Sequence, residues 1–181
     1  MKKTRRVKDW AFANLLGVQM ARGGDIIGIL HITDPKVLAD LADQSEIPAP
    51  LLAERPLLKL VQEHHPEVER YLKAETEFWT QLDDLRLAAY EAAWVQYGQK
   101  LQQHPKLAEL SLLGQHKRLV EIADGCLDPN PLQTAGCQNL ITQAKEKTAN
   151  IFHDIDPAFL PASVACFGPE PVATKKPPQQ A

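Results

Sequence analysis

"PEVERYLKAETEFWTQLDDLRLAAYEAAWVQYGQKLQQH", residues 66–104, is the stretch that decides the fold. It contains a single glycine, Gly98, and no proline after Pro66. Proline suits the first turn of a helix, and its ring disfavours helical geometry at the residue before it. The stretch therefore predicts one continuous helix that begins after His65 and is about 58 Å long at about 1.5 Å per residue.

Within this stretch, two series of largely apolar positions recur at spacings of three and four residues. The first series comprises Tyr71, Glu75, Phe78, Leu82, Leu85, Ala89 and Ala92. The second series, nearer the C-terminal end, comprises Leu87, Tyr90, Trp94, Tyr97 and Leu101. Such spacing is typical of a helix packed lengthwise on another, as in a coiled coil. We interpret the two series as one buried face that widens or rotates along the helix, which indicates more than one neighbour.

The flanking sequence predicts shorter helices separated by prolines. Apolar spacing predicts a helix over 10–21, and Asp34-Pro35 is a typical helix start. Residues 25–32 fit a strand or a helix, and we favour a helix. After Pro105, the pattern predicts an antiparallel partner of the long helix over about 105–125.

A last helix is predicted to start at Asn130-Pro131, which resembles a helix N-cap followed by proline at the first helical position. We therefore predict an all-α helical bundle of five or six helices around a long central helix (about 66–104). With 181 residues, 44% of them hydrophobic, one domain with its own core is expected. We place a basic N-terminal arm at 1–9, a single helical domain at 10–160 and a Pro-rich flexible tail at 161–181.

Charge is distributed unevenly, although the net charge is only -3. The first eight residues carry five basic side chains and no acidic one, namely Lys2, Lys3, Arg5, Arg6 and Lys8. An arm of this kind can bind phosphates, anionic lipid or the acidic surface of its own protein. The layout of residues 37–60 also resembles a helix-turn-helix, in which Arg55 is the only basic residue at the start of the second helix. A nucleic-acid interface would thus use the five basic residues of the arm and Arg55.

Three groups of polar residues invite comparison with metal sites. His64 and His65 are adjacent, and adjacent residues on a helix point about 100° apart, whereas ligand pairs need i and i+4 spacing. Asp83 and Asp84 fit a solvated helix face with intrahelical pairing, and His153 with its neighbouring aspartates fits a helix end. We therefore predict no metal, no cofactor and no catalytic site. A helical enzyme that assembles a site from distant residues remains an alternative.

The three cysteines, Cys126, Cys137 and Cys166, form no CxxC pair. Neither a disulfide framework nor a zinc site is indicated, and free thiols suggest a cytoplasmic protein. No apolar run approaches the roughly 20 residues that span a bilayer.

Aromatic residues concentrate in the long helix, and two interpretations are open. Aromatic side chains at helical spacing usually belong to a core. Alternatively, part of the set is exposed and forms a partner interface, for which the candidates are Trp79, Tyr90, Trp94 and Tyr97. We expect a non-catalytic interaction or assembly protein that acts through contacts with a protein partner or with further copies of itself, with no evident small-molecule substrate. The alternative is a nucleic-acid-binding regulator that uses the arm and residues 37–60.

Overall fold

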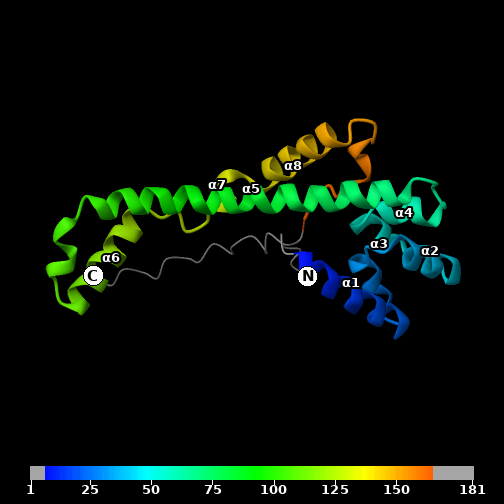
Figure 1. The fold of residues 1–181 in the computed structure, drawn as a ribbon, viewed down its shortest axis with the longest axis horizontal. Coiled ribbons are helices and arrows are strands. Elements are labelled where there is room, and N and C mark those ends of the chain that lie inside the picture. Colours follow the sequence, from blue (N-terminus) through cyan, green and yellow to red (C-terminus); the bar gives the residue numbers. More distant parts are fainter. Residues whose placement is uncertain (1–6, 165–181) are drawn as a thin grey trace, which may run out of the picture.

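The computed structural model describes residues 7–164, and every regular element in that range is a helix (Figure 1). Eight α-helices follow one another: α1 (Val7–Arg22), α2 (Pro35–Gln44), α3 (Ala49–Glu54), α4 (Leu57–Gln62), α5 (Val68–Gln102), α6 (Leu112–Cys126), α7 (Pro131–Ala135) and α8 (Cys137–Ile151). Three short 3-10 helices lie between or after them: η1 (Ile26–His31), η2 (Pro105–Glu109) and η3 (Pro157–Phe159). The all-α prediction is confirmed, and the long helix predicted over 66–104 is α5.

Two His-Pro pairs lie just outside α5. His64 has a φ of 52°, a conformation that non-glycine residues rarely adopt. His65 Nδ1 accepts a hydrogen bond from the backbone N–H of Glu67 at 3.3 Å, and Pro66 follows it before the helix begins. At the other end His104 precedes Pro105, after α5 has ended. The first pair therefore forms the joint between α4 and α5.

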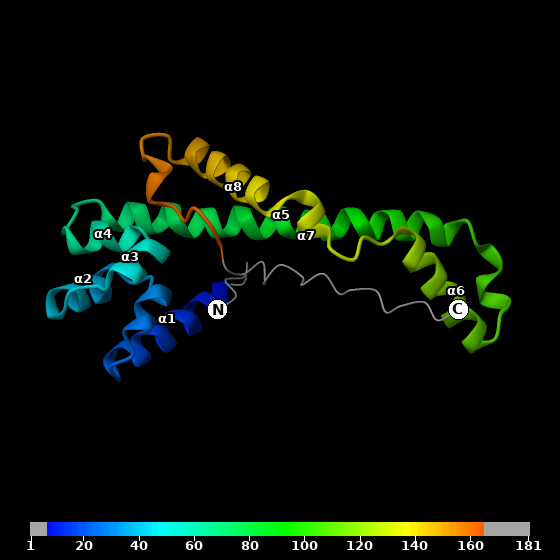
Figure 2. The same cartoon turned by 180° about the vertical axis from the view of Figure 1, so that it is seen from behind.

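The other helices occupy different parts of α5. Figures 1 and 2 show α1–α4 gathered on one side of the N-terminal half of α5 and α8 on the other side of that half. Among the described elements, only η2 and α6 lie at the far end of α5 (Figure 2). In the described part of the chain, more helices therefore pack around the N-terminal half of α5 than around its C-terminal end.

The hydrophobic core surrounds the N-terminal half of α5. Phe78 and Leu82 of α5 are 0% and 1% exposed, and they share one cluster with buried residues of η1, α2–α4, α8 and η3. Full burial of a large apolar side chain contributes about 1.5–3 kcal/mol. The core therefore fixes this half of α5 to the remaining helices.

A buried ion pair joins α5 to the segment before α4. Arg55 is 3% exposed and Glu75 is 2% exposed. Arg55 donates from Nη2 to Glu75 Oε2 at 2.6 Å and from Nε to Oε1 at 2.9 Å. Its Nη1 donates to the carbonyl oxygens of Ile29 and Ile32 at 2.9 and 2.7 Å. Because both charges are paired and hydrogen-bonded, the cost of burying them is offset.

Two glycines allow α1 and η1 to approach at backbone distance. A Cβ on Gly28 would lie 2.3 Å from the carbonyl oxygen of Gly17, and a Cβ on Gly17 would lie 2.6 Å from that of Gly28. No larger residue fits without a shift of the backbone. Asn14 of α1 reinforces the contact, since its Oδ1 accepts from the backbone N–H of Thr33 at 2.7 Å.

Several boundaries differ from those expected from the sequence. Helix α1 begins inside the arm placed at 1–9, and Pro161 and Val164, placed in the flexible tail, are buried and packed on the core respectively. The segment expected as one helix after Asn130 is divided at Gly136, whose φ of 80° a helix cannot contain. Within residues 25–32 the chain forms the 3-10 helix η1 (Ile26–His31), so the favoured helical interpretation holds and the strand does not.

Candidate interaction surface

Helix α5 has two faces that differ in their exposure to solvent. The first apolar series, from Tyr71 to Leu85, lies on the core face, where Glu75, Phe78 and Leu82 are buried. The second series, which we call the outer face, comprises Leu87, Tyr90, Trp94, Tyr97 and Leu101. Leu85 and Trp94 are nine residues apart, or two and a half turns at about 3.6 residues per turn, and so point in opposite directions. The prediction of one buried face that widens or rotates is therefore wrong.

The outer face is exposed from Leu87 to Trp94, whereas Tyr97 and Leu101 are partly buried. Leu87 is 44% exposed, Tyr90 is 47% exposed and Trp94 is 63% exposed. The rings of Trp94 and Tyr97 meet edge to face with their centroids 5.6 Å apart. At about 1.5 Å per residue the outer face is roughly 21 Å long. The contact between the two rings fixes part of this surface before any partner binds.

Toward the N-terminal end of α5, the positions in line with the outer face are shielded from solvent. The same helical spacing leads back from Leu87 to Asp83, Trp79 and Leu72. Leu72 is 4% exposed, Trp79 packs on the core, and the side chain of Asp83 is 13% exposed. Helix α8 packs against α5 and accompanies only this half (Figures 1 and 2). The line becomes exposed beyond the part of α5 that packs in the core.

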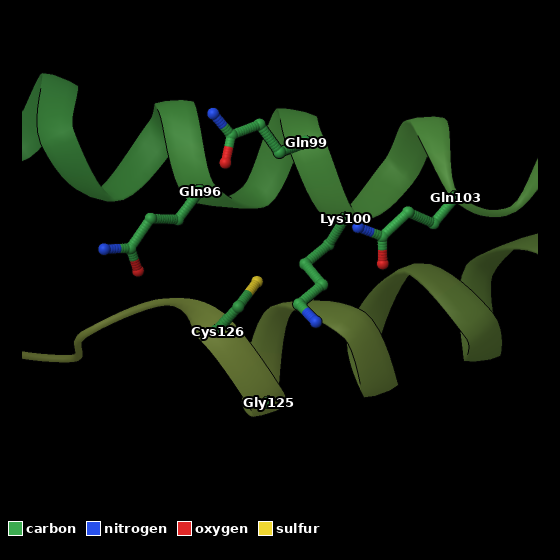
Figure 3. Close-up of a pocket in the computed structure, with 6 residues that line it drawn as sticks. All are labelled: Gln96, Gln99, Lys100, Gln103, Gly125 and Cys126. Carbon is green, nitrogen blue, oxygen red and sulfur yellow. The ribbon is translucent and has the colours of Figure 1, made fainter.

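Helix α6 does not cover the outer face because it contacts the opposite side of α5. An open depression of about 360 Å³ lies between the two helices (Figure 3). Its lining comprises Gln96, Gln99, Lys100, Gln103, Gly125 and Cys126. Gln96 of α5 is two residues, or about 200° around the helix, from Trp94, which places the two side chains on nearly opposite sides. The outer face therefore lacks α6 as a neighbour.

The depression itself offers little chemistry. Its side chains are three amides, the ammonium group of Lys100 and the thiol of Cys126 (Figure 3). The Cys126 thiol donates to the carbonyl oxygen of Ile122 within its own helix at 2.9 Å. Nucleophilic catalysis needs a base within hydrogen-bond reach of the nucleophile, and no residue that lines the depression supplies a carboxylate or imidazole.

Some aromatic side chains of α5 belong to the core and others are exposed, so each of the two interpretations from the sequence applies to part of them. Phe78 is buried, and Trp79 packs against the core, so Trp79 does not belong to an exposed interface. Tyr71 likewise packs on the core, where its ring meets that of Phe159 edge to face. Tyr90 and Trp94 are exposed, and Tyr97 is partly buried beside Trp94. Of the four interface candidates, the structure brings Tyr90, Trp94 and Tyr97 together.

The candidates for nucleic-acid contacts are not assembled in the described residues. Arg55 is buried against Glu75, so its guanidinium is unavailable to a phosphate. An arginine usually lies at the surface, and its sequence position gave no sign of this partner twenty residues away. Lys2, Lys3, Arg5 and Arg6 lie outside the described residues, as does the side chain of Lys8. Helix α3, where a recognition helix was considered, has only six residues.

The three polar groups compared with metal sites have other partners. His64 Nε2 lies 3.5 Å from Asp43, and the ring of His65 meets Tyr71 edge to face. Asp154, next to His153, forms an ion pair with Arg70 at the start of α5. Asp83 lies 3.9 Å from Arg86, and both side chains are less than 15% exposed, so the expectation of a solvated face is wrong here. Within residues 7–164, no three His, Cys, Asp or Glu side chains are grouped as metal ligands.

Comparison of the chain with protein-family models, curated proteins and solved structures found no match. In the described part of the chain, no helix combines the length and apolar character that crossing a membrane requires.

Proposed function

We propose that this protein is a non-catalytic interaction or assembly protein that binds another protein through the outer face of α5. The observation that carries the proposal is the exposure of Leu87, Tyr90 and Trp94 side by side on a helix whose opposite face is in the core. Tryptophan and tyrosine supply much of the binding energy of protein interfaces. Contiguous exposed apolar side chains often mark a contact surface.

The charge of this segment also supports a protein contact. Residues 87–101 contain only two charged side chains, Glu91 and Lys100, although 24% of the whole chain is charged. Interface centres are depleted of charged residues because desolvating a charge is costly. A phosphate backbone would instead require several basic side chains. The outer face therefore suits an apolar protein surface better than a nucleic acid.

The fold holds this surface in place before binding. The N-terminal half of α5 is fixed by buried Phe78 and Leu82 and by the Arg55–Glu75 ion pair. The exposed residues follow on the same uninterrupted helix. A rigid surface loses less conformational entropy on binding than a flexible one. A partner thus meets side chains whose backbone is already ordered.

A site-specific photo-cross-linker tests this proposal in cells that make the protein. The photoreactive residue replaces Trp94, and in a matched control it replaces Lys73, whose side chain is 66% exposed on α5 but outside the outer face. We expect a discrete covalent adduct from position 94 that is lost when Leu87→Glu is added. The absence of any protein adduct at 94, or equal labelling at 73, contradicts the proposal.

A further inference from the structure

We infer that the partner of the outer face is a second copy of this chain, with the two α5 helices antiparallel and Trp94 of each copy beside Trp94 of the other. This inference rests on the proposed function, because it takes the outer face to be a contact surface. It adds the identity of the partner and the direction in which the helices pair.

The order of the outer-face side chains is nearly symmetric about Trp94. Leu87 and Leu101 each lie seven residues from Trp94, and Tyr90 and Tyr97 lie four and three residues from it. The series thus reads Leu, Tyr, Trp, Tyr, Leu from either end. A two-fold interface requires a surface that is complementary to itself. Antiparallel pairing centred on Trp94 places Leu87 against Leu101 of the other copy.

The arrangement of the helices determines the direction of pairing. A parallel second α5 would continue along the N-terminal half of the first, where the same line of side chains belongs to the core. There the line through Leu72 and Trp79 is already covered. In the antiparallel arrangement the two α5 helices overlap only beyond Asp83. The N-terminal half of each α5, with the helices packed on it, then lies past the C-terminal end of α5 in the other copy. Only this arrangement leaves the packing around Leu72 and Trp79 unchanged.

The size of the surface determines the strength of the pairing. Leu87, Tyr90 and Trp94 are about half exposed, and an aromatic side chain offers about 150–250 Å². The outer faces of two copies therefore bury roughly 800 Å² together, below the roughly 1,200–2,000 Å² of stable interfaces. The few charges nearby, Glu91 and Lys100, leave little to desolvate. We expect a weak dimer that forms as the protein concentration rises.

Substituting the two leucines with opposite charges tests both the partner and the direction. Sedimentation equilibrium of the full chain over a wide concentration range measures dimerisation. Leu87→Glu is expected to weaken the dimer more than about tenfold, because it places a charge in an apolar contact. The double variant Leu87→Glu with Leu101→Lys is expected to recover dimerisation, since position 87 of each copy then meets the opposite charge at position 101 of the other. In a parallel dimer the same double variant would place like charges together and weaken the dimer further.

Mixing the two single variants provides a second test of the antiparallel pairing. Leu87→Glu and Leu101→Lys proteins, each weakly associating alone, are expected to form a heterodimer when mixed. Thermal melting of each variant checks that the fold is retained. A wild-type chain that stays monomeric, or a folded double variant no better than Leu87→Glu, overturns the inference. A monomeric chain whose position 94 still cross-links to a different protein overturns the self-pairing alone and leaves the proposed function standing.

Discussion

Phe78 and Trp94 belong to the same helix, yet Phe78 is 0% exposed and Trp94 is 63% exposed. The difference arises because the core that covers Phe78 does not extend along α5 as far as Trp94. Phe78 lies in the core with buried residues of η1, α2–α4 and α8, whereas Trp94 does not belong to this cluster. The N-terminal half of α5 therefore packs in the core, and its C-terminal half carries an exposed apolar surface.

Alanine substitutions at these two positions are expected to have opposite consequences. Phe78→Ala leaves a cavity in the core and should lower the free energy of unfolding by about 3–5 kcal/mol. Trp94→Ala removes a side chain with few contacts in the monomer and should change it by less than about 0.5 kcal/mol. Urea denaturation of dilute protein measures both. A large loss for Trp94→Ala would mean that Trp94 supports the fold of the single chain.

The buried pair Arg55–Glu75 should show strong coupling in a double-mutant cycle. Glu75→Ala leaves the guanidinium buried and unpaired, so we expect a loss of about 3–5 kcal/mol in unfolding free energy. Arg55→Ala should cost a similar amount, because it also deprives two carbonyl oxygens of their donor. The double variant should lose clearly less than the two single losses together. Additive losses would contradict a direct interaction between the two side chains.

The close approach of α1 and η1 predicts a specific intolerance at Gly28. Gly28→Ala places a methyl group 2.3 Å from the carbonyl oxygen of Gly17, so the backbone must move. We expect a loss of about 1–3 kcal/mol in unfolding free energy. Gly125→Ala in α6 is the matched control, since a Cβ there meets nothing within 4 Å. It should raise stability by about 0.4–1 kcal/mol because it restricts the unfolded chain. Equal effects at both sites would contradict the packing of α1 on η1.

Asp128 provides a test of local electrostatics before α7. Its hydrogen bond with Thr134, and a second from the backbone N–H of Asn130 at 2.8 Å, lower the pKa of its carboxyl below 3.8. A lowered pKa in the folded state means that the contribution to stability is present above pH 3.8 and is lost as the pH falls through the folded pKa. An NMR titration of the carboxyl carbon should show this low midpoint, and Thr134→Val should raise it. An unchanged midpoint in that variant would exclude the side-chain hydrogen bond as the main cause.

Much of the fold is predictable because its signals are local. Pro66 and Pro105 bound the long helix, and Asp34 caps α2 by accepting from the backbone N–H groups of Lys36 and Val37. Both features depend on neighbouring residues alone. The break at Gly136 is harder to predict, because a glycine within an apolar pattern does not by itself indicate a positive φ.

The interaction surface could be predicted only in part. Tyr90 and Trp94 have helical spacing, which a core and an interface share, so the sequence could not distinguish them from Phe78 and Trp79. The distinction depends on which part of α5 packs in the core with the other helices, and that is a tertiary relationship. Arg55 was misassigned for a related reason, since its partner Glu75 belongs to another helix.

The 19F NMR spectrum of the full chain labelled with fluorotryptophan tests the role of the outer face in a single sample. The chain has three tryptophans, so Trp10 and Trp79 serve as internal controls for Trp94. As the protein concentration rises, the Trp94 resonance should shift while the other two stay in place, because the second copy covers Trp94 alone. A Trp94 resonance that stays at its dilute position at every concentration would contradict the pairing of two outer faces.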